Sequence, residues 1–278
     1  MKTIVILGAG QIGKTTAALI NHTLFRILAF GDNAVSGHIY NIPIFSVEKA
    51  LQLRSDIVVI AVRDTVRTKE LKQQIQNLGF IGQIVSLSDF IDVMDMRSAV
   101  LFRAADRICN VEGSIAELGV YKGEFAVTLN ELFPDRKLYL FDTFSGFDSR
   151  DIRTEAECGF SQADMHDFSD TNAAEVWERL PHKDNVIIFQ GYFPLTCKDI
   201  QDVFALVSLD ADLYEPTLAA LEWFLPRLAA GGILIIHDWD SNRFKGIRKA
   251  VADYEKNHGR LALVPLGDFH GTAIVVKE

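Results

Sequence analysis

Acidic side chains stand at or just after the ends of several apolar runs in this sequence. These acids are Glu117, Asp142, Asp210, Asp212, Asp238 and Asp240. Carboxylates at such positions can accept the hydroxyls of a ribose, hold a cation or take a proton from an alcohol. Each could instead cap the helix that follows it, as aspartate before a helix often does. A group of acids converging on the ends of adjacent strands favours a site over a set of caps.

A glycine turn lies between the first two of these acids. The apolar run 114–118 is followed by Gly119 and Gly123, and then by a segment with apolar residues at helical spacing. This pattern predicts a strand, a tight turn and a helix whose first N–H groups are free for a polar ligand. Asp142 ends the next apolar run, 19 residues after Gly123, where a carboxylate can accept both ribose hydroxyls. Together the two features predict a nucleoside site.

The N-terminus carries a second glycine turn. A buried-type strand at 3–7 leads into a G-x-G-x-x-G fingerprint, with an aspartate 19 residues beyond its last glycine. The residues expected to hold a ligand there are Gly8, Gly10, Gln11, Ile12, Gly13 and Asp32. Lys14 and Thr15 also complete a P-loop pattern, but only the dinucleotide interpretation explains Gly10 and Asp32. Alternatively, this region has lost its ligand and serves docking or dimerisation.

Strand and helix signals alternate along the chain and predict an α/β protein. Residues 1–92 are expected to form a small Rossmann-like domain with a parallel sheet, residues 93–112 a linker and a helix, and residues 113–278 a second domain. Strands of the second domain are expected at 114–118, 137–142, 186–190, 204–209, 232–237, 261–265 and 272–276. The last two lack an intervening helix, which predicts a seven-stranded doubly wound sheet with an antiparallel last strand. This is the shape of a class I methyltransferase.

Bulk composition excludes several classes of function. A net charge of −9 lacks the basic face that nucleic-acid binding needs. The 3 cysteines are too widely spaced for a disulfide framework or a zinc site. The N-terminal apolar run is too short for a signal peptide, and no run reaches the roughly 18–20 residues of a membrane helix. We therefore expect a cytoplasmic protein, a homo-oligomer, with a small-molecule substrate and neither nucleic-acid nor membrane partners.

Five segments, in order and at matching spacing, resemble motifs of the macrocin O-methyltransferase (TylF) family. They are 116–123, 140–147, 191–194, 209–214 and 231–238. The resemblance covers about residues 98–278 and implies an S-adenosylmethionine-dependent enzyme that methylates a hydroxyl of a sugar or glycoside. It implies cofactor contacts from Glu117, Gly119, Tyr121, Gly123, Asp142, Thr143, Phe144, Gly191 and Asp210. The N-terminal domain resembles the nucleotide-sugar-binding domain of bacterial sugar O-acyltransferases, which implies a nucleotide or nucleotide sugar there.

Methyl transfer to an alcohol needs the reactants in line and a base or Lewis acid for the proton. The strands 204–209 and 232–237 should be neighbours, so Asp210 and Asp238 can share a divalent cation such as Mg²⁺. The resemblance implies these two as metal ligands and Asp212 as the general base. Where most members carry another aspartate, this chain has His237. His237 could ligate manganese or iron, act as a base or fill the wall, and Asp240 could then be the substitute ligand.

Residues 145–172 have little apolar period and are expected to form one long loop, which we predict closes as a lid over donor and acceptor. Phe144, Phe147 and Tyr192 could stack on adenine or pack this lid.

Two other functions stay open. In an NAD(P)-dependent oxidoreductase of nucleotide sugars, residues 1–92 would bind the dinucleotide, but the sequence offers no clear hydride-handling pair and Asp142 has no purpose. A non-catalytic nucleoside-binding sensor would need only the glycine turns.

Overall fold

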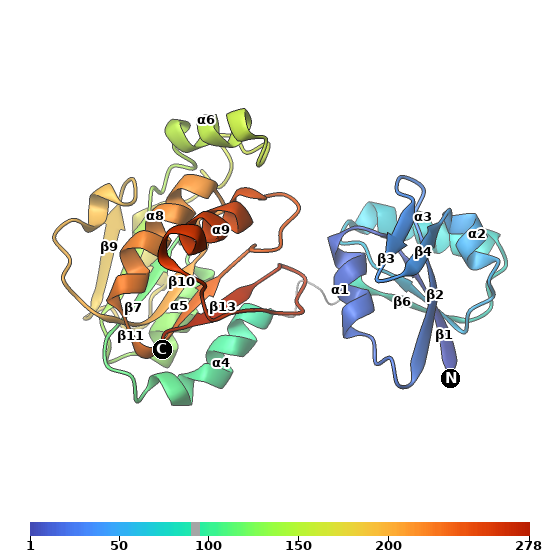
Figure 1. Cartoon of the computed structure of the whole chain (residues 1–278), viewed down its shortest axis with the longest axis horizontal. Coiled ribbons are helices and arrows are strands. Elements are labelled where there is room, and N and C mark those ends of the chain that lie inside the picture. The colour runs from blue at the N-terminus through green and yellow to red at the C-terminus, as the bar shows by residue number, and fades with distance from the viewer. Residues whose placement is uncertain (90–94) are drawn as a thin grey trace. The chain divides into compact units, whose positions relative to one another are not determined.

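The computed structural model describes residues 1–89 and 95–278, and the chain divides into two compact units. Unit 1 comprises Met1–Asp95 with Gly267–Phe269, and unit 2 comprises Met96–Leu266 with His270–Glu278. The boundary predicted between residues 92 and 93 lies outside the described residues. Each unit is built on its own sheet (Figure 1).

Unit 1 has a six-stranded sheet in the order β3-β4-β2-β1-β5-β6. Its strands are β1 (Lys2–Leu7), β2 (Phe25–Gly31), β3 (Gly37–Ile39), β4 (Ile42–Phe45), β5 (Ile57–Ile60) and β6 (Gln83–Ser86), and its helices are α1 (Gln11–Leu19), α2 (Val47–Leu51) and α3 (Thr65–Asn77). All pairs are parallel except β3 with β4. Their hairpin turn, Tyr40 and Asn41, has φ angles of 50° and 64°, which suit a two-residue turn between twisted strands. The predicted parallel domain therefore carries one antiparallel edge strand.

Unit 2 has a seven-stranded sheet in the order β12-β13-β11-β10-β7-β8-β9. Its strands are β7 (Ser114–Leu118), β8 (Leu138–Asp142), β9 (Val186–Gln190), β10 (Phe204–Leu209), β11 (Leu228–Ile236), β12 (Leu263–Pro265) and β13 (Ala273–Val276). Its helices are α4 (Met96–Ile108), α5 (Glu124–Leu132), α6 (Ser149–Cys158), α7 (Ala173–Arg179), α8 (Tyr214–Phe224) and α9 (Gly246–His258). The strands pair in parallel except at β13, which pairs antiparallel with both β11 and β12. The predicted class I methyltransferase sheet with an antiparallel last strand is confirmed.

Alternate residues of the central strands face two apolar layers in unit 2. On β7, Ile115 packs in the cluster that includes α4, α5 and α7, whereas Ala116 and Leu118 pack in the cluster that includes α8 and α9. This period of two is what a strand covered on both faces requires. Such packing holds the parallel strands with their carboxyl ends at one edge. Among the described residues, no helix is both long and apolar enough to cross a membrane.

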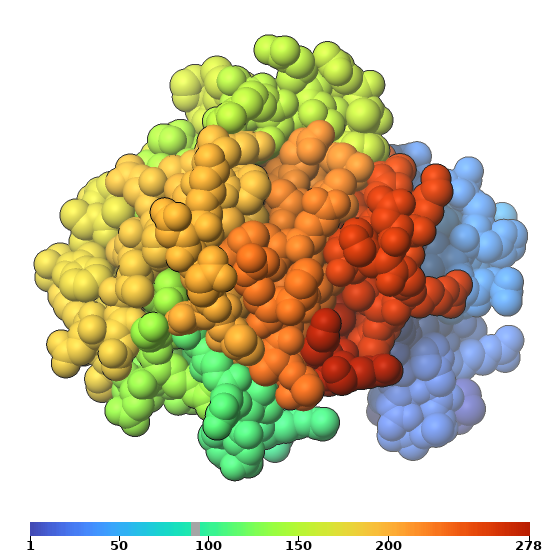
Figure 2. Space-filling view, turned by 60° about the vertical axis from the view of Figure 1, so that its left-hand side comes forward, coloured from blue at the N-terminus to red at the C-terminus, as the bar shows by residue number. Residues whose placement is uncertain are grey.

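Residues 145–172 are not one long loop, because they contain α6. Asp148 caps the first turn of this helix by accepting a backbone N–H. Glu155 is buried and accepts the N–H of Tyr214 at 2.8 Å, which ties α6 to the start of α8. The segment with α6 forms a projecting ridge of unit 2 (Figure 2). The cap at Asp148 and the buried carboxylate of Glu155 stabilise α6, which has no continuous apolar face. The spacing of apolar residues therefore does not predict this helix.

Candidate active site

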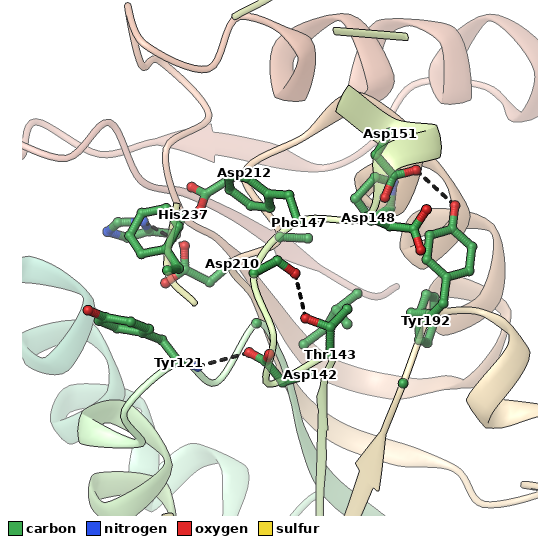
Figure 3. Close-up of a pocket in the computed structure, with 18 of the residues that line it drawn as sticks. Tyr121, Asp142, Thr143, Phe147, Asp148, Asp151, Tyr192, Asp210, Asp212 and His237 are labelled. Carbon is green, nitrogen blue, oxygen red and sulfur yellow. Dashed lines mark hydrogen bonds and ion pairs between the residues drawn. The ribbon is translucent and has the colours of Figure 1, made fainter. Parts of the chain in front are cut away.

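Unit 2 has a cavity beyond the carboxyl ends of β7, β8, β9, β10 and β11 (Figure 3). It measures about 930 Å³, including the space at its open mouth. The predicted site residues that line it are Gly119, Tyr121, Asp142, Thr143, Gly191, Asp210, Asp212, His237 and Asp238. The sheet therefore brings the acids predicted from separate strand ends into one cleft.

Asp142 ties the glycine turn together. Its Oδ2 accepts the N–H groups of Val120 at 2.7 Å and Tyr121 at 2.9 Å, and its Oδ1 accepts the N–H of Phe144 at 2.6 Å. Three donors on one carboxylate fix the acid and the turn relative to each other. The ring of Phe144 is buried in the core and does not line the cavity, so only its backbone serves the site.

Gly119 and Gly123 both have positive φ angles, and a side chain at either position would clash with a different neighbour. Gly119 has a φ of 86°, and a Cβ there would lie 2.0 Å from the carbonyl oxygen of Asp210. Gly123 has a φ of 80° at the start of α5, and its Cβ would meet Val176 of α7 at 2.9 Å. Gly119 thus lets the ends of β7 and β10 approach each other. Gly123 does not line the cavity and serves the turn and its packing.

Asp210, Asp212 and His237 lie on one side of the cavity (Figure 3), and Asp238, next to His237, also lines it. They follow β10 and β11, which pair in parallel as predicted. The Nδ1 atom of His237 lies 2.9 Å from Oδ1 of Asp210 and 3.5 Å from Oδ2 of Asp238. Asp212 and Asp238 have left-handed φ angles of 60° and 53°. Such backbone costs free energy, and it is concentrated at functional sites.

Burial and mutual charge shift the pKa values in this cluster. Burial raises the pKa of Asp212 well above its usual range, and the charges of Asp210 and Asp238 raise it further. Burial also opposes ionisation of Asp210, but the charges of His237 and Arg97 outweigh it and hold the pKa of Asp210 below its usual range. Burial disfavours the His237 cation, yet Asp210 outweighs that effect and raises the His237 pKa to about 10. The cluster therefore holds an ionised Asp210 between two cations at neutral pH.

Arg97, in the first turn of α4, belongs to the segment expected only as a linker and a helix. Its Nη1 atom lies 2.5 Å from Oδ2 of Asp210, and its guanidinium lies 4.1 Å from the ring centroid of Phe125. Glu117 is buried and does not line the cavity. Burial raises the pKa of Glu117 well above its usual range, and the charge of Arg97 opposes that rise. Arg97 is therefore a counter-charge for two acids of the site.

Asp210, Asp238 and His237 do not fit a metal ion in this arrangement. Both oxygens of Asp210 already have partners: Oδ2 pairs with Arg97, and Oδ1 lies 2.9 Å from Nδ1 of His237. Asp240, the substitute ligand, pairs with Arg248. Within residues 1–89 and 95–278, no group of three or more His, Cys, Asp or Glu side chains is placed to hold a metal ion. Metal assistance therefore stays a prediction from the sequence.

The opposite side of the cavity is formed by Asp148, Asp151 and Tyr192 (Figure 3). The hydroxyl of Tyr192 donates to Oδ1 of Asp151 at 2.8 Å. The Arg150 guanidinium stacks on the Tyr192 ring, 3.7 Å from its centroid, and pairs with Asp148 at 2.7 Å. Burial raises the pKa of Asp151 to about 6. Neither aspartate is predicted from sequence, because both lie in the segment expected to be a loop.

We expect Asp151→Asn to gain stability relative to the wild type as the pH rises from 4 to 7. Because the folded-state pKa of Asp151 is raised from 3.8 to about 6, the folded protein binds more protons than the unfolded chain, and its stability falls as pH rises through this window. The amide does not titrate, and its oxygen can still accept from Tyr192. A shift of about two pKa units corresponds to at most about 3 kcal/mol.

Urea unfolding at both pH values measures this difference. The 3 tryptophans of the chain, Trp177, Trp223 and Trp239, all lie in unit 2, so their fluorescence reports its unfolding. An equal stability difference between variant and wild type at pH 4 and 7 would contradict the raised pKa.

Unit 1 repeats the pairing of a glycine turn with an acid. Asp32 accepts the N–H of Ala9 at 2.9 Å and that of Ala34 at 2.8 Å. Gly8 has a φ of 109°, and a Cβ on Gly13 would lie 2.0 Å from the Gly8 carbonyl oxygen. Gly10 is the N-cap of α1, and Gln11 and Ile12 are the first residues of this helix. One cavity of unit 1 is lined by Ala17, Ala18, His22, Ile27, Tyr40 and Ile42. The residues of the glycine turn are not among these lining residues.

The strand order, the glycine turn with its acid on the next strand, and the acidic cleft define a class I S-adenosylmethionine-dependent methyltransferase fold. Within that class, the chain belongs to the macrocin O-methyltransferase (TylF) family, whose model matches residues 93–275. This match confirms the resemblance found in the sequence motifs.

Two curated relatives from streptomycetes are similar to this chain. The 8-demethyl-8-(2,3-dimethoxy-alpha-L-rhamnosyl)-tetracenomycin-C 4'-O-methyltransferase of Streptomyces olivaceus is 27% identical over 177 residues, which are 59% of this chain and 65% of the relative. Demethyldecarbamoylnovobiocin O-methyltransferase of Streptomyces niveus is 26% identical over 143 residues, 47% of this chain and 54% of the relative. The chain thus spans less than two thirds of the length of these relatives.

Two solved structures share the fold. The calicheamicin methyltransferase CalS11 has a TM-score of 0.55 and 23% identity, and the match covers 77% of this chain and 86% of that one. The O-methyltransferase NovP has a TM-score of 0.54 and 20% identity, covering 65% of this chain and 79% of that one. At these identities the likeness concerns the fold alone.

Proposed function

We propose that unit 2 is an S-adenosylmethionine-dependent O-methyltransferase that acts on a hydroxyl of a sugar or glycoside. The observation that carries the proposal is that Asp142 and its glycine turn share one cavity with Asp210 and Asp212. A nucleoside site alone would serve many functions, whereas acids beside it offer a base for an alcohol. Family membership supports O-methylation, and the name of the rhamnosyl-modifying relative supports a sugar acceptor.

The lining of the cavity suits the proposed donor. When bound, S-adenosylmethionine supplies an electrophilic methyl group on a sulfonium. We assign it to Gly119, Tyr121, Asp142, Thr143 and Gly191, with Asp210 lining the same cavity. An ionised carboxylate has about four acceptor positions, so Asp142, which accepts three backbone N–H groups, keeps capacity for a ribose hydroxyl. Glu117, Gly123 and Phe144 do not line the cavity and support the residues that do.

Asp212 is the proposed general base. The acceptor hydroxyl passes its proton to a carboxylate oxygen of Asp212 while the hydroxyl oxygen takes the methyl group from the sulfonium. Burial beside Asp210 and Asp238 raises the pKa of Asp212, which brings its proton affinity closer to what a base near neutral pH needs. His237, the second predicted catalytic residue, suits a charge-stabilising role better because its pKa is raised to about 10 and its Nδ1 faces Asp210.

Calorimetric titration tests the function against its alternatives. We expect S-adenosylhomocysteine to bind the wild type and NAD not to bind in unit 2. Binding of NAD without S-adenosylhomocysteine would instead indicate the oxidoreductase. Binding of S-adenosylhomocysteine without methyl transfer to any alcohol would indicate the sensor. The comparisons with known proteins favour neither alternative.

The role of unit 1 is a separate proposal, because the family match begins at residue 93. We propose that its glycine turn and Asp32 hold a nucleotide or a nucleotide sugar and so present a linked acceptor. Titration with a nucleotide sugar tests this, and equal binding by the wild type and Asp32→Ala would count against it. Dimerisation through unit 1, the homo-oligomer and the cytoplasmic location stay predictions from the sequence.

We expect residues 145–172 to resist proteolysis more strongly once donor product and acceptor are bound. The end of this segment already meets the cavity: Phe168 lines it, and Asp170 accepts from the Tyr121 hydroxyl at 2.7 Å and from the Lys122 ammonium at 2.6 Å. Ligands at the glycine turn should therefore order the segment further. Limited proteolysis with and without S-adenosylhomocysteine and a rhamnoside measures the effect. Equal cleavage rates would contradict a closing lid.

A further inference from the structure

We propose that Arg97 is a positioning residue of the methyl-transfer site, and that its guanidinium supplies from the protein the positive charge that a metal would bring to Asp210. The inference rests on the proposed function of unit 2. It concerns a residue that carries no sequence motif of the site and that lies 113 positions from Asp210 in the chain.

Contacts with Asp210 and Phe125 hold the guanidinium of Arg97 in place. Its Nη1 atom lies 2.5 Å from Oδ2 of Asp210, and its plane lies over the ring of Phe125 on α5, 4.1 Å from the centroid. The side chains of Arg97 and Asp210 are only 15% and 21% exposed. Ion pairing and cation–π stacking are both stronger where water is excluded, so this cation is fixed rather than merely nearby.

The charges around Arg97 explain why the site needs a cation there. Glu117 and Asp210 lie at the ends of the adjacent strands β7 and β10, and both are largely buried. Two carboxylates taken out of water are costly unless a positive group accompanies them. Arg97 pairs with Asp210, and its charge favours the ionised form of both acids. A permanent cation therefore already balances Asp210, the acid that a divalent ion would otherwise balance.

The same geometry leaves Asp210 poorly suited as a metal ligand. Its Oδ2 is paired with Arg97 and its Oδ1 lies 2.9 Å from Nδ1 of His237. A divalent ion would have to displace one of these groups and would then sit beside the guanidinium charge. With Asp210 clamped, the tight turn that carries Asp212, with its left-handed φ of 60°, is fixed as well. Arg97 thus acts on the base through Asp210.

Metal binding and turnover test the proposal on the full chain. Mn²⁺ is titrated and followed by electron paramagnetic resonance, and methyl transfer from labelled S-adenosylmethionine to 4-nitrophenyl α-L-rhamnoside is measured with and without EDTA. We expect the wild type not to bind Mn²⁺ at micromolar concentrations and EDTA not to change its rate. Arg97→Met should lose about 10- to 100-fold in kcat with little change in the KM for the donor. It should also gain Mn²⁺ binding, and added guanidinium ion should restore part of its rate.

Two variants control for loss of structure. Arg97→Lys keeps a charge and should retain more activity than Arg97→Met, whereas Arg103→Ala, an exposed arginine on the same helix, should match the wild type. Stoichiometric Mn²⁺ binding by the wild type with activity lost to EDTA would overturn the proposal, as would Arg97→Met with wild-type kcat. The Mn²⁺ titration of the wild type needs neither a folded variant nor an acceptor. Its outcome is therefore distinguishable from failure of the proposed function.

Discussion

Replacing Asp212 by Asn is expected to lower the turnover number by about 10²- to 10⁴-fold, the usual contribution of a general base. The amide cannot take the proton of the acceptor hydroxyl, but it keeps the size of the side chain. Binding of S-adenosylhomocysteine should be nearly unchanged, because Asp142, which holds the glycine turn and is the proposed ribose contact, lies on another strand. Methyl-transfer kinetics with a rhamnoside and calorimetry of the donor product give the two readouts.

A matched control for this variant is Asp184→Asn. Asp184 is exposed in the connection that leads into β9, at the end of the strands opposite the cavity. Its replacement by Asn should leave kcat unchanged. Turnover of Asp212→Asn at the wild-type rate would show that another group removes the proton.

Replacing Asp142 by Ala is expected to weaken binding of S-adenosylhomocysteine by at least about 100-fold. One ribose hydrogen bond to the carboxylate, at about 1.5–3 kcal/mol, accounts for about 10- to 100-fold of this loss. The loss should be larger because the N–H groups of Val120, Tyr121 and Phe144 lose their acceptor and the turn loosens. Isothermal titration calorimetry measures the affinity, and tryptophan fluorescence reports whether unit 2 stays folded.

Unit 1 offers a close control, since Asp32 ties its own glycine turn through Ala9 in the same way. Asp32→Ala should leave the affinity for S-adenosylhomocysteine unchanged. If Asp32→Ala loses this affinity and Asp142→Ala keeps it, the donor site lies in unit 1 and the assignment of the two units is wrong.

The sheet of unit 2 could be predicted because its signals are local. Apolar runs such as 204–209 end in acids and alternate with amphipathic helices, and parallel pairing then follows from the connections between them. The same locality explains the failure at α6. Its sequence has no apolar stripe, and its helix depends on a cap at Asp148 and on Glu155 reaching the start of α8.

The sequence predicts a site residue only where a side chain with suitable chemistry stands at the end of a predicted strand. Asp142 ends a strand, and Asp210 and Asp212 follow one, so the sequence alone predicts that they converge. Arg97 could not be found this way, because its pairing with Asp210 is purely tertiary. Phe144 shows the reverse case: its motif position predicts a contact with the cofactor, which stays a prediction, while the structure places its ring in the core and its N–H on Asp142.

A crystal structure of the protein with S-adenosylhomocysteine tests the central claim most directly. We expect the ribose at Asp142, and the sulfur on the side of the cavity where Asp210, Asp212 and His237 lie, with open space between that sulfur and Asp212 for an alcohol. Electron density for the nucleoside in unit 1, or in unit 2 with its sulfur turned away from these acids, would contradict the account.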